Sequence, residues 1–319
     1  MKNRGIIILL ICLSLIIIGV VAFDYISKRP DRSPENPYAI NIDEYIQDDT
    51  SLIMYNEVRN IRLDTALIRG IAYHDNKIYI LGNDFLQAIS PEGRELMRVT
   101  IPLSPGCIAL SESKIFIGYN DHISAFNKNG ELISAWDTIG KKSVLTSLAV
   151  TDGNLFAADA GNRRVLRYTT DGNLMGQFEG KSDTGQLHGF IIPSANFDLA
   201  VNHDGELWVV NPGKHALEQY TYEGRMIGFW ENASFNIDGF SGCCNPAQMA
   251  VLPDGSFVTS EKGIVRIKVH KPSGEMLCIV APTKSFGNAF LAPDIAITPE
   301  GVILALDFDN HMVRVYQHK

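Results

Sequence analysis

The sequence lacks the short motifs that mark many enzymes. It has no G-x-S-x-G nucleophile elbow, no glycine-rich phosphate loop and no H-E-x-x-H zinc motif. Its five cysteines show no C-x-x-C spacing, which is the usual mark of zinc and haem sites. We therefore expect no cofactor, and the sequence predicts no resident metal.

Positive charge is also scarce. The chain has 28 Lys and Arg against 36 Asp and Glu, for a net charge of −8. Because phosphate backbones are bound by basic surfaces, this balance argues against nucleic acid as a partner. A local basic patch remains compatible with it.

The N-terminus carries an uncharged apolar run, Ile6–Phe23, that is long enough to cross a bilayer as a helix. Lys2 and Arg4 precede it, so the positive-inside rule keeps the N-terminus in the cytoplasm. We expect a retained signal-anchor helix at 1–23 and a domain outside the cytoplasm, periplasmic or extracellular. A cleaved signal peptide, ending at Val20-Val21-Ala22, is the alternative.

Residues 24–50 contain Pro30, Pro34 and Pro37 among charges and show no apolar periodicity. This composition predicts a flexible linker between the membrane and the remaining domain, 51–319.

The segment Ser147–Gly180 shows how that domain is built. It contains four short apolar runs rich in β-branched or aromatic residues, Leu148–Val150, Leu155–Ala158, Val165–Tyr168 and Leu174–Phe178. Asp152-Gly153 and Asp171-Gly172 separate runs within it, and Asp-Gly supplies the positive φ of a tight hairpin turn. The pattern predicts a meander of four strands.

Five more copies align on the apolar-Ala pair of that segment, at Ala72, Ala109, Ala200, Ala250 and Ala296. Their spacing is about 40–50 residues, the length of a propeller blade. We therefore predict an all-β fold, a six-bladed β-propeller.

The last copy stops after its third strand, Met312–Gln317, while an unpaired apolar alternation, Leu52–Leu63, precedes the first copy. We predict that Leu52–Leu63 completes the last blade and closes the ring, because an open sheet edge invites aggregation.

The repeats resemble the NHL family. The resemblance rests on Asp159-Ala-Gly-Asn162-Arg-Arg-Val165 and Asp307-Phe-Asp-Asn310-His-Met-Val313, and it extends over 51–319. It implies a six-bladed propeller. We expect this propeller to bind a protein, a peptide or a small anionic ligand.

In such a blade the first and third turns lie on one face of the disc, and the second turn and the inter-blade links lie on the other. The long links are Glu179–Phe197, Glu231–Gln248 and Ala281–Asp294. Because long loops in compact domains are usually functional, we expect the ligand site on this second face, which we call the looped face.

Basic second-turn residues from consecutive blades are expected to form a patch there that suits a carboxylate or phosphate. The predicted ligand-binding residues are Arg163, Arg164, Lys214, His215, Lys262 and His311. The competing interpretation is that Asp159, Asn162, Asp307 and Asn310 fold back onto their own turns and the cations are solvated.

The string Ser241-Gly-Cys-Cys-Asn-Pro246 is the most distinctive local feature. Adjacent cysteines rarely pair with each other, so we expect Cys243 or Cys244 to form a disulfide with Cys278. A redox-active pair or soft-metal thiolates at Cys243 and Cys244 is the alternative, and inert thiols are the third.

The histidines are the basis of an alternative function. Another member of the NHL family, the peptide-amidating lyase, binds zinc through channel histidines, so the resemblance also implies a metal-dependent lyase or hydrolase as an alternative. Four histidines map to the looped face: His122, His188, His215 and His311. Because scattered loop histidines are usually surface residues, we favour a membrane-anchored binding platform without enzymatic activity.

Overall fold

The computed structural model describes residues 2–27, 45, 49–65, 67–181 and 189–319. The chain divides into two compact units, Met1–Glu44 and Tyr45–Lys319. The described part of the first unit is one helix, α1 (Lys2–Ser27), whose segment Ile8–Tyr25 is long and apolar enough to cross a membrane. Most of the predicted linker, 24–50, lies outside the described residues.

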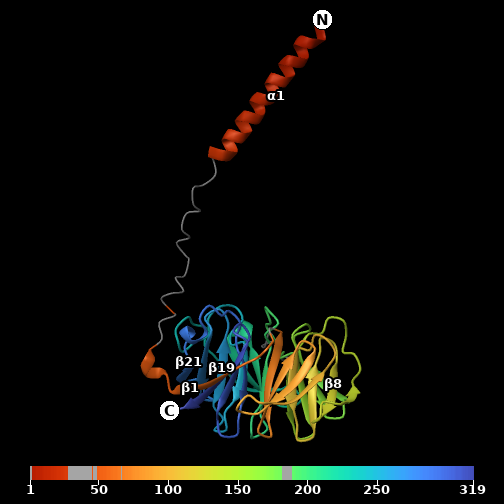
Figure 1. Ribbon diagram of the computed structural model, residues 1–319, viewed down its shortest axis with the longest axis vertical. Coiled ribbons are helices and arrows are strands. Elements are labelled where there is room, and N and C mark those ends of the chain that lie inside the picture. Colours follow the sequence, from red (N-terminus) through yellow and green to blue (C-terminus); the bar gives the residue numbers. More distant parts are fainter. Residues whose placement is uncertain (1, 28–44, 46–48, 66, 182–188) are drawn as a thin grey trace. The chain divides into compact units, whose positions relative to one another are not determined.

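The second unit consists of six four-stranded antiparallel sheets, which are the predicted six blades (Figure 1). Blades one and two contain β2 (Ile68–His74), β3 (Lys77–Gly82), β4 (Phe85–Ile89), β5 (Glu95–Thr100), β6 (Cys107–Leu110), β7 (Lys114–Gly118), β8 (Ile123–Asn127) and β9 (Leu132–Ala135). Blades three and four contain β10 (Leu145–Thr151), β11 (Asn154–Asp159), β12 (Arg164–Thr169), β13 (Leu174–Phe178), β14 (Leu199–Val201), β15 (Leu207–Asn211), β16 (Ala216–Tyr220) and β17 (Met226–Glu231).

Blade five contains β18 (Gln248–Val251), β19 (Phe257–Glu261), β20 (Arg266–His270) and β21 (Met276–Ala281). Blade six contains β22 (Asp294–Ile297), β23 (Ile303–Asp307), β24 (Met312–His318) and β1 (Tyr55–Arg62). Among the described residues, three short 3-10 helices lie outside the strands, η2 (Thr50–Leu52), η3 (Pro212–Lys214) and η4 (Thr283–Phe286).

Blade three shows why the sequence forms these strands. The four predicted apolar runs lie in β10 to β13, and β11 is buried along both faces from Leu155 to Asp159. Gly153 and Gly172 take φ of +73° and +96° in the connecting turns, a conformation that favours glycine. The meander predicted from this segment is confirmed.

The ring closes through the two ends of the second unit. β1 pairs with β24 along its length, from Tyr55 opposite His318 to Arg62 opposite Met312. In Figure 1 the orange β1 lies beside the blue strands that end the chain. The prediction that Leu52–Leu63 completes the last blade is confirmed.

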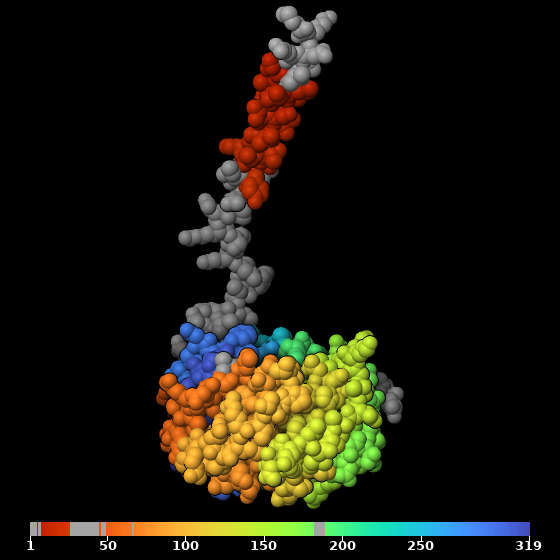
Figure 2. All heavy atoms as spheres, turned by 45° about the vertical axis from the view of Figure 1, so that its right-hand side comes forward, coloured from red at the N-terminus to blue at the C-terminus, as the bar shows by residue number. Residues whose placement is uncertain are grey.

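The core lies between blades. Each of six hydrophobic clusters joins residues of two neighbouring blades, for example Phe156 of β11 with Leu199 of β14. Figure 2 shows the chain colours passing around the propeller in order from orange to green, as consecutive neighbouring blades require. Buried aromatic rings such as Phe116, Tyr79 and Phe257 fill these interfaces.

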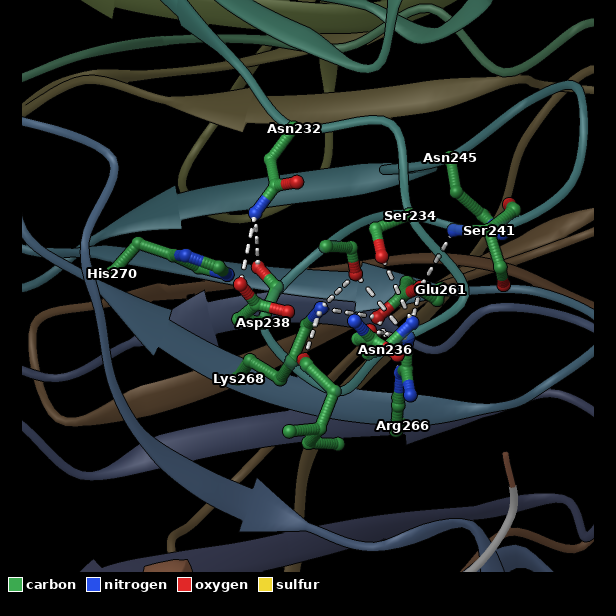
Figure 3. A network of polar contacts seen from close by, with 12 residues as sticks. Asn232, Ser234, Asn236, Asp238, Ser241, Asn245, Glu261, Arg266, Lys268 and His270 are labelled. Atoms are coloured by element: carbon green, nitrogen blue, oxygen red, sulfur yellow. Dashed lines mark hydrogen bonds and ion pairs between the residues drawn. The ribbon is translucent and has the colours of Figure 1, made fainter. Parts of the chain in front are cut away.

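A buried ionic network fixes one of the long links to blade five (Figure 3). Glu261 Oε1 lies 2.7 Å from Arg266 Nε and 2.8 Å from Lys268 Nζ, and all three side chains are fully buried. Arg266 also donates to the carbonyls of Asn236 and Gly239, and Lys268 to that of Ile237. The two cations therefore bind the backbone of the 232–247 link, which reaches the looped face.

Candidate functional site at the looped mouth of the channel

The first strands of the blades line a central channel that contains a cavity of about 340 Å³. In each blade, one residue precedes the apolar-Ala pair of the repeat. These six positions make up the channel ring: Cys107, Ser147, Asp198, Gln248 and Asp294 line the cavity, and the sixth position is Gly70. The channel is thus more polar than the interfaces between blades.

Two buried carboxylates stand in this ring. Burial raises the pKa of Asp198 to about 6, although Ser147 and the backbone amides of Met249 and Leu199 donate hydrogen bonds to it. Burial and the neighbouring charge of Asp198 raise the pKa of Asp294 to about 7. Near neutral pH a larger fraction of these two side chains is therefore protonated than of surface aspartates.

The channel opens through a mouth on each face. The mouth at the tight turns has a volume of about 990 Å³ and is lined by first- and third-turn residues, among them His74, Glu112 and Lys128. The other mouth, of about 810 Å³, is lined by link residues such as Ala195 and Leu291 together with second-turn residues such as Lys262. The links and second turns therefore share one face, which is the looped face.

The looped mouth combines cations with exposed apolar side chains. Arg69, Lys262 and His311 line it, and so do Leu67, Phe290 and Leu291. The last three are 58%, 64% and 49% exposed. Exposed apolar groups clustered around a cavity are typical of interaction sites.

The cations of this mouth hydrogen-bond neutral side chains, and Lys262 also hydrogen-bonds Cys244. Arg69 Nη2 donates to Asn83 Oδ1 at 2.9 Å, and Lys262 Nζ donates to Ser194 Oγ at 3.0 Å. Neither makes an ion pair with a described residue. The nearby carboxylate of Asp309 accepts hydrogen bonds from the backbone amides of Phe290 and Leu291, which orders the apolar part of the rim.

The structure separates the six predicted ligand-binding residues. Lys262 and His311 line the looped mouth, whereas the other four do not. Arg163 is exposed, and Arg164 Nε lies 2.9 Å from the buried Asp159 Oδ2. Lys214 Nζ lies 3.4 Å from Glu218 Oε1, and His215 Nδ1 lies 2.9 Å from the carbonyl of Asn245.

The Asp and Asn residues of the repeat motif have a structural role. Asn162 and Arg164 both donate to Asp159, and Asn310 and Arg314 both donate to Asp307. Burial alone would raise the pKa of Asp159, but these hydrogen bonds and one from the Val144 amide hold that pKa below its ordinary value. The carboxylates therefore fold back onto their own turns, as the competing interpretation expected.

The cysteines do not form the expected bridge. Cys278 is buried in the core between blades five and six, and Cys243, Cys244 and Cys278 are all free. The sulfur atoms of Cys243 and Cys244 lie 3.0 Å apart. In this structure the side chain of Cys278 packs into the hydrophobic core and does not bridge to Cys243 or Cys244.

The histidines of the looped face are dispersed. His122 stacks on Tyr119, His215 contacts Asn245, and His311 lines the mouth. His188 lies outside the described residues. Within the described part of the chain, no three His, Cys, Asp or Glu side chains are grouped so that they could hold a metal ion.

Sequence reasoning missed part of this site. Arg69, Phe290 and Leu291 were not among the predicted residues, although Phe290 and Leu291 lie in one of the long links that were expected to bear function. Arg69 directly precedes Gly70 of the channel ring, so alignment of the repeats would have placed it at the mouth.

Comparisons with known proteins identify the fold but no family. No family model matches the chain, and no curated protein is similar to it. A streptogramin B lyase structure is 13% identical, with a TM-score of 0.58 over 82% of this chain and 97% of that one. A protein of unknown function from Bacteroides thetaiotaomicron gives 14% identity and a TM-score of 0.60, covering 82% and 72%.

A third similar structure is that of a catalytically inactive virginiamycin B lyase from Staphylococcus aureus with quinupristin. It is 18% identical, with a TM-score of 0.53 over 80% of this chain and 87% of that one. At such identities the likeness concerns the propeller architecture alone.

Proposed function

We propose that this protein is a binding platform whose looped mouth takes an anionic ligand that also carries an apolar group, such as a protein segment or peptide with carboxylates beside an apolar side chain. The observation that supports this most directly is the presence of Arg69 and Lys262 in the same cavity as the exposed Phe290 and Leu291. Guanidinium and ammonium groups would hold the carboxylates, and the rim would bury the apolar side chain.

The propeller is further proposed to work outside the cytoplasm, in the periplasm or the extracellular space, with α1 as its membrane anchor. The positions of Lys2 and Arg4 before the apolar segment support this orientation. Protease added to intact cells or spheroplasts should degrade the propeller, whereas a cytoplasmic propeller would be protected.

Two matched peptides test the ligand class. One alternates Glu with Phe and the other Lys with Phe, each labelled with fluorescein, and fluorescence anisotropy measures their binding to the full chain in detergent. We expect binding of the acidic peptide only, weakened by salt. Lys262→Glu and Arg69→Glu should each weaken it about tenfold or more, because each removes a hydrogen bond to a charged group and adds repulsion.

Lys77→Glu is the matched control, since Lys77 lines the opposite mouth. Equal binding of the two peptides, or an equal loss of affinity in Lys77→Glu, would contradict the proposal. Arg163 tests whether the site is wider than the mouth. Arg163→Ala should weaken binding if the ligand extends beyond the mouth toward blade three. Binding equal to that of the parent chain would exclude Arg163 from the ligand site.

The metal-dependent lyase or hydrolase is the alternative function. Elemental analysis of the purified full chain distinguishes it from the binding platform, since stoichiometric zinc, calcium or iron would favour the alternative.

A further inference from the structure

Cys243 and Cys244 form a close sulfur pair at the looped face. Their Sγ atoms lie 3.0 Å apart and share a hydrogen bond. Cys243 is exposed and Cys244 is buried. The sulfur of Cys243 can thus react with a reagent from solvent, and the buried sulfur of Cys244 lies next to it.

The residues around the pair hold this arrangement in place. Asn245 Nδ2 donates to the carbonyl of Ser241 at 2.7 Å and to that of Lys262 at 3.0 Å, while Asn245 Oδ1 accepts from the Lys262 amide at 2.9 Å. The amide of Ser241 donates to Glu261 Oε2, which belongs to the buried ionic network of blade five. These hydrogen bonds therefore hold residues 241–246 against the turn that carries Lys262.

Lys262 and Ser194 favour the ionised form of Cys244. Lys262 Nζ donates to Ser194 Oγ at 3.0 Å, and both side chains also hydrogen-bond Cys244. Burial opposes ionisation of Cys244, but these hydrogen bonds and the charge of Lys262 hold the pKa of this thiol below its ordinary value. A thiolate beside an ammonium group is the usual environment of a reactive cysteine.

We propose that Cys243 and Cys244 are a two-electron redox site that reacts with low-molecular-weight disulfides and closes reversibly into a disulfide between the adjacent residues. Exposure of Cys243 makes such a bond easy to reduce again, because exposed disulfides are the labile ones. The inference does not depend on what the looped mouth binds.

The reaction proceeds by thiol–disulfide exchange. The two cysteines share one proton, which passes to Cys244 as Cys243 attacks a small disulfide RSSR. The S–S bond of RSSR breaks, RS⁻ leaves, and a mixed disulfide remains on Cys243. RS⁻ takes the proton from Cys244, whose thiolate attacks Cys243 Sγ, forms the Cys243–Cys244 bond and expels the second RS⁻. The cysteines lose two electrons, and RSSR gains them.

Mass spectrometry of the full chain in detergent tests this directly. Trypsin releases Met226–Lys262, which contains Cys243 and Cys244 and no other cysteine. After incubation with oxidised glutathione and blocking with iodoacetamide, we expect this peptide to lack two hydrogen atoms and to carry no alkyl group. Dithiothreitol should restore both reactive thiols.

Substitutions separate the roles of the two sulfurs. Cys244→Ser should stop at a glutathione adduct on Cys243, because no second thiol resolves it. Lys262→Met, which keeps both thiols, should slow the reaction about tenfold through loss of a hydrogen bond to a charged group. Lys271→Met, at a tight turn on the opposite face, should react at the parental rate.

Three results would overturn the inference. The peptide of the parent chain keeps both alkylatable thiols in oxidised glutathione, or it stays a glutathione adduct, or it becomes linked to the peptide that carries Cys278. Each of these is read from the parent chain, so the test does not depend on whether a variant folds.

Discussion

Asp198 and Met249 join two blades: the carboxylate of Asp198, at the start of blade four, accepts a 2.6 Å hydrogen bond from the Met249 amide in blade five. Asp294 does the same for Ile71, at 2.9 Å, across the boundary between blades six and one. Both carboxylates are buried in the channel wall, so each links neighbouring blades through a group whose ionised form is costly to bury.

Asp198 should make the stability of the protein depend on pH. Because its folded pKa is about 6 against an ordinary 3.8, the folded chain holds this proton more tightly than the unfolded chain. Its contribution to the free energy of unfolding therefore falls as pH rises from about 4 to 6, by ~3 kcal/mol. Asp198→Asn removes this titration but gives up one of the two backbone hydrogen bonds.

Urea unfolding followed by tryptophan fluorescence measures the effect. The parent chain should exceed Asp198→Asn in stability most at pH 4, and the difference should shrink by ~3 kcal/mol toward pH 7. Asp152→Asn, in an exposed turn, serves as control. A difference that stays constant with pH would show that Asp198 does not titrate in this range.

His270 should give the opposite dependence of stability on pH. Burial and the charge of Lys268 lower its pKa to about 3 from 6.5. The unfolded chain therefore binds this proton below pH 6.5 and the folded chain does not, so stability is lost as pH falls from 6.5 toward 3. The ring packs on Trp230 and Phe240, and its hydrogen-bond contact with the Gly274 carbonyl is 3.4 Å long.

His270→Phe keeps the packing and removes the titration. Relative to the parent chain, the variant should gain about 3 kcal/mol in unfolding free energy between pH 6.5 and 4.5. The same urea experiment measures it, and parallel pH profiles for the two chains would refute the assignment.

Removal of the Glu261 charge should be strongly destabilising. Glu261→Gln removes the carboxylate that pairs with the fully buried Arg266 and Lys268, and the loss of one member of such a set costs roughly 3–5 kcal/mol. Glu275→Gln is the matched control, because its pair with Lys271 is largely exposed and is worth less than ~1 kcal/mol. Similar unfolding midpoints for the two variants would contradict this.

The role of β1 predicts a sharp boundary for truncation. A chain that begins at residue 49 keeps β1 and the buried Tyr55 and Ile61, so it should be monomeric by size-exclusion chromatography. A chain that begins at residue 64 exposes the edge of β24 and should aggregate. A monomeric, cooperatively unfolding product from residue 64 would show that β1 is dispensable.

The architecture was predictable because its signals are local and repeated. The Asp-Gly turns, the four short apolar runs and the unfinished last copy can all be recognised from spacing in the sequence. The site was less predictable, because charge alone does not say whether a cation is already paired. Arg164 and Lys262 both carry a positive charge, yet Arg164 neutralises the buried Asp159 and Lys262 lines the mouth.

The arrangement of the cysteines was less predictable for a similar reason. Cys278 lies in blade five, which follows the link that carries Cys243 and Cys244, but sequence gives no side-chain direction for a residue near a bulge. The register of β21 shifts on either side of Cys278, and its side chain turns to the core. The sulfur pair instead results from the conformation of residues 241–246, which is held by the hydrogen bonds of Asn245 and Ser241.

Pairing of β1 with β24 also governs how this protein is made. The first propeller strand to leave the ribosome finds its partner only when the last residues have been synthesised, so vectorial folding cannot finish the sixth sheet. Blades one to five can form in order from local contacts, whereas the final step joins the two ends of the unit and depends on the longest sequence separation in the fold.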